Sequence, residues 1–272
     1  MADEGKGEAS MTFWEHLDVL RASLLRILAV AALCSVAAFL CKDKMFDVIL
    51  APGSSDFVMY RLFDRVAAGL GAGPTGSFAI RLINTDLAAQ FVIHMKTAVF
   101  VGLLLSSPYT LYLLFRFVSP ALYENERKYS VGIVVSAYFM FLAGVAMNYF
   151  LIFPLTVRFL GMYQVSATVE NVITLQSYMD TFSMMCLAMG VVFEVPVLCW
   201  LLARVGMLTS SLMCKYRKHA VVLILVVAAV ITPTSDVFTL MLVSLPIWLL
   251  YEASVFIVRL TEKNKSGVPD AV

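Results

Sequence analysis

Acidic side chains that could do chemistry stand in three parts of this sequence. Glu15 and Asp18 lie within Phe13 to Arg21, two glutamates lie beside aromatic residues within Phe117 to Lys128, and Glu194 stands alone in an apolar run. Carboxylates near a low-dielectric interface can accept bidentate hydrogen bonds from guanidinium groups, a geometry that Lys cannot reproduce. The second segment therefore indicates recognition of arginine side chains, with solvated structural charge as the alternative.

The first acidic segment is predicted to be an amphipathic helix at 12–21. Thr12 and Glu15 have the spacing of a capping box, in which each side chain satisfies the other's free backbone donor. Apolar residues recur at helical spacing and leave Glu15 and Asp18 on another face. These apolar residues are Phe13, Leu17, Leu20 and Leu24. The alternative is a lead-in helix whose acids are only solvated.

Glu194 is unusual because it falls near the middle of an apolar segment. A carboxyl at that depth in a membrane costs several kcal/mol unless it is paired, hydrated or protonated. Pro196, two residues further on, predicts a helix kink beside it. The alternative role of Glu194 is that of a hydrogen-bonded structural acid.

The composition indicates a membrane protein. Of the 272 residues, 61% are hydrophobic and 14% are charged, far from the usage of soluble domains. The net charge of +1 gives no reason to expect a nucleic-acid partner. The three histidines lack metal-ligand spacing, and the common hydrolase and phosphate-loop motifs are absent from the sequence, so we expect no enzyme, metal or cofactor.

Hydropathy predicts an all-α protein with six membrane spans, each requiring about 20 apolar residues. The predicted spans are 22–40, 89–115, 129–153, 178–202, 219–232 and 238–258. Turn formers from Thr232 to Asp236 separate the last two. The fifth span is short, so we expect the bilayer to thin beside it.

Outside the spans, residues 41–88 are expected to form an extracytoplasmic cap with short interfacial helices, and 263–272 a flexible tail. The chain is predicted to be a single integral membrane domain. Six spans place both termini on one side, and the larger share of Lys and Arg falls on that side, which predicts cytoplasmic termini.

Several segments resemble, in order, the signature segments of the TatC family over residues 12–260. They are F-W-E-H-L-D-V-L-R from Phe13, F-V-S-P-A-L-Y-E-N-E-R from Phe117, Ser107-Pro108, Phe193-Glu194-Val195-Pro196-Val197, and Thr232-Pro233 followed by Asp236-Val237-Phe238. The resemblance implies a subunit of the twin-arginine protein translocase in the bacterial inner membrane. It also implies TatA- and TatB-like single-span partners, a complex of several copies, and export of folded proteins driven by the proton-motive force.

The resemblance further implies a cytoplasmic site for the paired arginines of signal peptides. By position, Glu126 is the arginine-binding glutamate and Arg21 closes the N-terminal motif. The residues that shape the loop are Phe117, Pro120, Leu122 and Tyr123. The family's second glutamate is replaced by Val19, and helical geometry favours Glu15 over Asp18 as its substitute, because Glu15 points in nearly the same direction one turn earlier.

For the membrane interior, the resemblance implies that Glu194 and Pro196 belong to a concave groove that contacts partner helices or the inserted signal peptide. Asp86, Lys96 and Asp236 fall where the family has polar residues. From their sequence neighbourhood, Lys96 and Asp86 could instead form an interfacial group with Gln90 and His94, and Asp236 could simply cap the last span.

Two other classes of function fit the composition. A secondary transporter of a small solute would place its site at broken helices between repeated halves, but no internal repeat is visible. An intramembrane hydrolase would need a catalytic pairing of Ser, Asp or His that the predicted spans lack.

Overall fold

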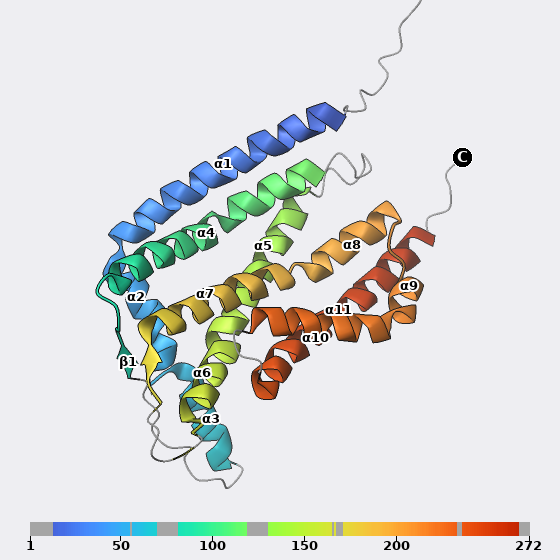
Figure 1. Cartoon of the computed structure of the whole chain (residues 1–272). Coiled ribbons are helices and arrows are strands. Elements are labelled where there is room, and N and C mark those ends of the chain that lie inside the picture. The colour runs from blue at the N-terminus through green and yellow to red at the C-terminus, as the bar shows by residue number, and fades with distance from the viewer. Residues whose placement is uncertain are drawn as a thin grey trace, which may run out of the picture.

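A computed structural model of the chain consists mainly of helices (Figure 1). It describes residues 13–54, 56–69, 81–118, 130–164, 166, 171–232 and 236–266. The helices are α1 (Phe13–Leu40), α2 (Lys42–Leu50), the 3-10 helix η1 (Ala51–Gly53), α3 (Val58–Gly69), α4 (Ala89–Val118), α5 (Ser130–Met147), the π-helix η4 (Asn148–Ile152), α6 (Phe153–Met162), α7 (Leu175–Val192), α8 (Val195–Val205), α9 (Ser210–Lys215), α10 (Arg217–Ile231) and α11 (Val237–Ser266). The predicted all-α class is confirmed. Strands β1 (Leu82–Ile83) and β2 (Ile173–Thr174) add one short parallel pairing.

Five helical stretches in the described part of the chain are long and apolar enough to cross a membrane. They are Leu17–Leu40, Ala89–Phe117, Gly132–Met162, Leu175–Val205 and Val237–Lys263. The predicted span at 219–232 coincides with α10, whose 15 residues reach only about 22 Å, against a hydrocarbon core of about 30 Å. A sixth crossing, with local bilayer thinning, therefore stays a prediction.

Several helices run further than the sequence pattern indicates. The amphipathic segment at 12–21 continues into the first span as the single helix α1. The helix predicted to end at 153 reaches Met162, because a π turn directly precedes Pro154, and the proline therefore does not end the helix. The flexible tail predicted from 263 is wrong at its start, since α11 runs to Ser266, and 267–272 lie outside the described residues.

Small residues allow the long helices to pack closely. The helices α1 and α4 run antiparallel side by side (Figure 1). A Cβ atom on Gly102 of α4 would lie 2.6 Å from the backbone nitrogen of Ser35 on α1. A Cβ atom on Gly144 of α5 would lie 2.5 Å from the carbonyl oxygen of Met189 on α7. Glycine at these two crossings is therefore required by close approach of the backbones.

One end of the bundle carries α2, η1, α3 and the strand pair, and we call it the cap end (Figure 1). The opposite end, where α1 begins and α11 stops, is called the termini end. The Tyr60 hydroxyl of α3 lies 3.0 Å from the carbonyl oxygens of both Pro52 and Pro154, and Tyr178 donates to Ile49. Burial raises the pKa of Tyr60 to about 12, although the Arg158 guanidinium nearby opposes the shift. The cap is thus fixed to the bundle by buried hydrogen bonds.

Candidate recognition surface and intramembrane groove

The start of α1 lies beside the end of α4 at the termini end. Ser35 contacts Gly102 where the antiparallel helices cross, and Arg21 is fourteen residues before Ser35, as Arg116 is fourteen after Gly102. Equal helical rise therefore brings Arg21 to the level of Arg116, just before the predicted arginine-binding loop. The two predicted recognition segments thus start from neighbouring positions.

The predicted recognition residues are only partly visible in the structure. Asp18, Val19 and Arg21 are exposed on α1, and Phe117 is half-buried at the end of α4. Glu15 lies on α1, but its side chain is outside the described residues. The loop residues Pro120, Leu122, Tyr123 and Glu126 also lie outside them.

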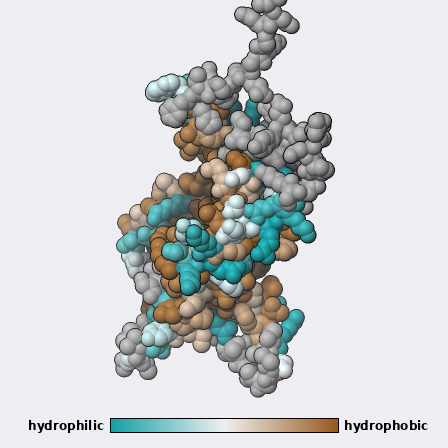
Figure 2. All heavy atoms as spheres, turned by 90° about the vertical axis from the view of Figure 1, so that its right-hand side faces the viewer, coloured by the Kyte–Doolittle hydropathy of each residue, from teal (hydrophilic) through white to brown (hydrophobic). Residues whose placement is uncertain are grey.

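Charged residues gather elsewhere at the termini end, around α9. Figure 2 shows hydrophilic residues at mid-height on the face toward which α9 lies. Arg217 donates to Glu252 at 2.7 Å, and Glu262 accepts a hydrogen bond from the Ser210 backbone N–H at 3.0 Å. These contacts tie α9 and α10 to α11, so the termini end is both charged and cross-linked by polar contacts.

Glu194 stands in a break between two helices. The helix α7 ends at Val192, and α8 begins at Val195 with Pro196 in its first turn. Proline has no N–H to donate to the preceding turn. The predicted kink is present as a two-residue break between α7 and α8. Glu194 is buried, and its Oε1 has no hydrogen-bond partner among the described residues. This lack of a partner speaks against a merely structural acid, because an unpaired buried oxygen destabilises the fold.

The Glu194 side chain lines a cavity of about 430 Å³, which we call the Glu194 cavity. Ser107 and Thr110 of α4 are the other hydrogen-bonding side chains of its lining, within the described part of the chain. The remaining lining is apolar: Ile27, Leu103, Leu111, Leu114, Phe115, Phe141, Leu187, Val191, Leu198 and Leu201. The cavity is therefore an apolar groove with a few polar groups, the usual composition of a ligand site.

An ion pair joins α4 to α7 nearer the cap end, outside the lining of the Glu194 cavity. Lys96 of α4 and Asp180 of α7 approach within 3.3 Å, and both are half-exposed. Asp180 precedes Leu187 by seven residues on α7, so these two share one face of the helix, whereas Glu194 lies beyond the end of α7. Lys96 precedes Leu103 and Thr110 on α4 by seven and fourteen residues. Lys96 therefore lies on the α4 face that lines the Glu194 cavity, about 20 Å along the helix from Thr110.

The predicted interfacial group at the start of α4 differs from the structure at His94, which is buried. Lys96 pairs with Asp180, and Asp86 lies exposed in the turn before α4. His94 is buried against α1, with its ring 4.0 Å from that of Phe39 and its Nε2 3.1 Å from the Phe39 carbonyl oxygen. Sequence reasoning missed Asp180, which lies eighty-four residues after its partner Lys96.

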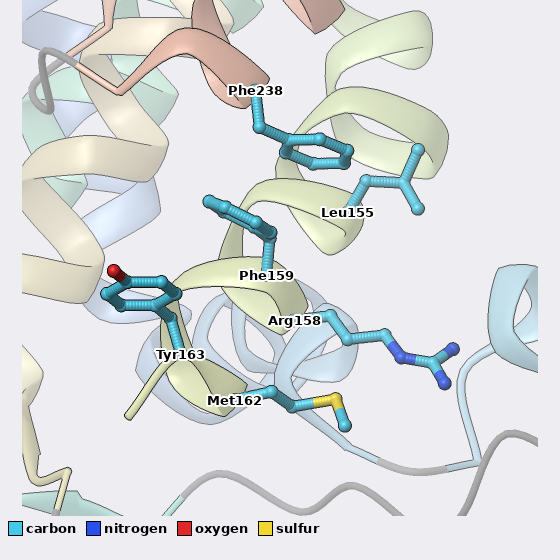
Figure 3. A pocket seen from close by; sticks show the side chains of 6 residues that line it. All are labelled: Leu155, Arg158, Phe159, Met162, Tyr163 and Phe238. Atoms are coloured by element: carbon cyan, nitrogen blue, oxygen red, sulfur yellow. The ribbon is translucent and has the colours of Figure 1, made fainter. Parts of the chain in front are cut away.

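Asp236 has the structural role that was one of its two predicted alternatives. Its Oδ1 accepts a hydrogen bond from the Thr239 N–H at 2.7 Å and so caps α11. The neighbouring Phe238 stacks on Phe159 of α6 with ring centroids 4.3 Å apart. Figure 3 shows these rings facing each other in a cleft of about 380 Å³, with Arg158 directed away from them. The contacts fix the start of α11 at the cap end.

Comparison with known proteins identifies the family. The sequence model described as "Sec-independent protein translocase protein (TatC)" matches residues 15–246. The chain belongs to the TatC family. It is 32% identical over 260 residues to the TatC protein of Blattabacterium sp. subsp. Periplaneta americana (strain BPLAN), covering 94% of this chain and 97% of that protein. It is 31% identical to the Deinococcus radiodurans TatC protein, over 92% of this chain and 87% of the relative.

The fold agrees with this assignment. A crystal structure of a "Twin Arginine Translocase Receptor", TatC, superposes with a TM-score of 0.74 at 26% identity, covering 91% of this chain and all of that one. The chain is therefore a membrane protein and a component of the Sec-independent, twin-arginine protein translocase. In the part of the chain that the structure describes, no group of three or more His, Cys, Asp or Glu side chains could hold a metal.

Proposed function

We propose that this chain binds twin-arginine signal peptides at a cytoplasmic termini end, with Glu126 accepting hydrogen bonds from the paired guanidinium groups. The observation that carries the proposal is the adjacency of the first turns of α1 to the end of α4, from which the loop of Glu126 continues. Both termini are then cytoplasmic. Phe117, Pro120, Leu122 and Tyr123 would shape the loop.

Glu15 and Asp18 are the candidates for the second carboxylate, with Glu15 preferred. Val19 is exposed on α1, so another side chain of α1 that projects in the same direction as Val19 is accessible to a peptide. Glu15 points about 40° from that direction and Asp18 about 100°. Arg21 is exposed on the same helix and would orient these acids.

The Glu194 cavity would receive an apolar helix after recognition. We infer that this helix belongs to the signal peptide or to TatA- and TatB-like single-span subunits, assembled in several copies in the bacterial inner membrane. The open, mostly apolar lining with a few polar groups supports this role. The chain would catalyse no covalent reaction and use no cofactor, and the proton-motive force would supply the energy for export of folded proteins.

The decisive experiment is a binding titration of full-length purified protein with a twin-arginine signal peptide and its twin-lysine variant. We expect the twin-lysine peptide to bind at least about tenfold more weakly, because a bidentate charge-assisted contact contributes about 1.5 to 3 kcal/mol. Glu126→Ala should abolish this preference, and Glu124→Ala, in the same loop, is the matched control. Equal affinities in all combinations would refute the recognition proposal.

A further inference from the structure

A second cavity lies beneath α2 at the cap end, and we call it the α2 cavity. Its volume is about 750 Å³, and residues of α1, α2, α4, α5, η4 and α7 line it. Most of the lining is hydrocarbon, such as Ala38, Leu105 and Phe182. Among its described lining residues, Lys44 alone is charged.

The α2 cavity is separate from the Glu194 cavity, since the two have no lining residue in common. From α4, the α2 cavity takes Val101 and Leu105, whereas the Glu194 cavity takes Leu103, Ser107 and Thr110. Phe100 and Leu104 also line the α2 cavity and share a helix face with Leu111 and Phe115 of the Glu194 cavity, so the two cavities adjoin along α4. A ligand of the α2 cavity would contact a different set of residues from a ligand of the Glu194 cavity.

The geometry of α2 places Lys44 at the edge of the cavity. Lys44 and Val48 are one helical turn apart and both line it. Asp43 and Asp47 are not lining residues, and Asp47 lies about 60° from Lys44 around the helix. Lys44 is exposed and makes no ion pair with any described residue. Its ammonium group is therefore a positive charge at the mouth of an apolar cavity, near the level where α1 leaves the membrane.

We propose that the α2 cavity binds an anionic phospholipid, with an acyl chain in the cavity and the phosphate beside Lys44. The volume falls within the range of roughly 300 to 1,000 Å³ that is usual for small-ligand pockets. The unpaired Lys44 charge selects an acidic headgroup.

Native mass spectrometry of the detergent-purified full chain, titrated with phosphatidylglycerol or phosphatidylcholine, tests this proposal without any signal peptide. We expect one phosphatidylglycerol per chain to bind at least tenfold more tightly than phosphatidylcholine. Lys44→Glu should abolish the preference, whereas Lys42→Glu, on the same helix but outside the lining, should retain it. Ala146→Phe should fill the cavity and prevent retention of either lipid, and Ala146 is exposed enough for the variant to fold.

The outcomes separate the two parts of the proposal. An unchanged preference in Lys44→Glu would overturn the headgroup assignment. Undiminished binding by Ala146→Phe would overturn the cavity assignment. A second copy of the chain bound in place of lipid, and released by Ala146→Phe, would replace the lipid by a protein partner. None of these results depends on signal-peptide recognition.

Discussion

The two cavities beside α4 differ in what their polar groups do. The Glu194 cavity contains a buried carboxyl oxygen without a partner, together with two hydroxyl-bearing side chains. The α2 cavity has its charge at the rim and hydrocarbon inside. An unpaired buried carboxyl destabilises the folded chain, whereas hydrocarbon in contact with lipid does not. The difference supports the two proposals, that Glu194 serves an incoming ligand and that the α2 cavity serves the bilayer.

The crossing of α5 and α7 at Gly144 lies where the two cavities adjoin. Phe141 lines the Glu194 cavity, and Leu142 and Val145 line the α2 cavity. We expect Gly144→Leu to lower the free energy of unfolding by about 3 kcal/mol or more, because its Cβ would collide with the Met189 carbonyl and the Phe193 ring. Thermal melting of the purified protein measures the effect.

The control for this variant is Gly132→Leu, on the same helix. A Cβ atom at Gly132 meets nothing within 4 Å. It should change the melting temperature little. Similar destabilisation by both variants would mean that the close approach at the crossing does not account for the loss, since Leu favours a helix more than Gly does.

Replacement of Glu194 by an apolar residue would remove the buried carboxyl that distinguishes the Glu194 cavity from the α2 cavity. We expect Glu194→Leu to reduce export of a twin-arginine precursor by roughly tenfold, the equivalent of about 1.4 kcal/mol, while the protein becomes more stable by about 1 to 3 kcal/mol. Glu194→Gln keeps the shape and distinguishes the need for an ionisable group from the need for a hydrogen bond. Export assays in cells that lack their own copy of this protein measure the loss of export, and melting curves of the purified variants measure the change in stability. A parallel loss of stability and export would assign Glu194 a structural role.

The sequence predicted the parts of the fold that depend on hydropathy and local chemistry. Long apolar runs identified the spanning helices, and Pro196 identified the break beside Glu194. The capping role of Asp236 followed from its position before an apolar run. A capping side chain accepts a hydrogen bond from the first turn of the helix that follows it, so the role depends only on nearby sequence.

Features that depend on contacts between distant segments were not predicted. Lys96 was assigned to its sequence neighbours because nothing local announces that Asp180, eighty-four residues later, lies 3.3 Å away. His94 was expected at the interface, but the end of α1 covers it. The α2 cavity likewise arises only when several helices meet. The recognition loop remains a prediction from sequence.

The Lys96–Asp180 pair offers a test of how far the Glu194 cavity extends toward the cap end. We expect Lys96→Glu or Asp180→Lys to lower export roughly fivefold, equivalent to about 1 kcal/mol, since like charges would then face each other across α4 and α7. The double variant should recover export if the residues act mainly on each other. Failure of the double variant, with both single variants still folded, would show that one of these charges meets a ligand in the groove.

The smallest expected effect concerns the attachment of the cap that roofs the α2 cavity. Tyr60→Phe removes the hydroxyl between the Pro52 and Pro154 carbonyl oxygens and should lower stability by about 1 kcal/mol. The folded-state pKa of Tyr60, about 12, lies above the ordinary tyrosine value of 10.0, so its contribution is complete below pH 10 and is lost as pH rises through 12. The difference in melting temperature between wild type and Tyr60→Phe should thus be constant from about pH 6 to 9 and shrink above pH 10. Export should be unchanged, because the cap bond is remote from Glu194, and a loss of export with normal stability would mean that the two regions are coupled.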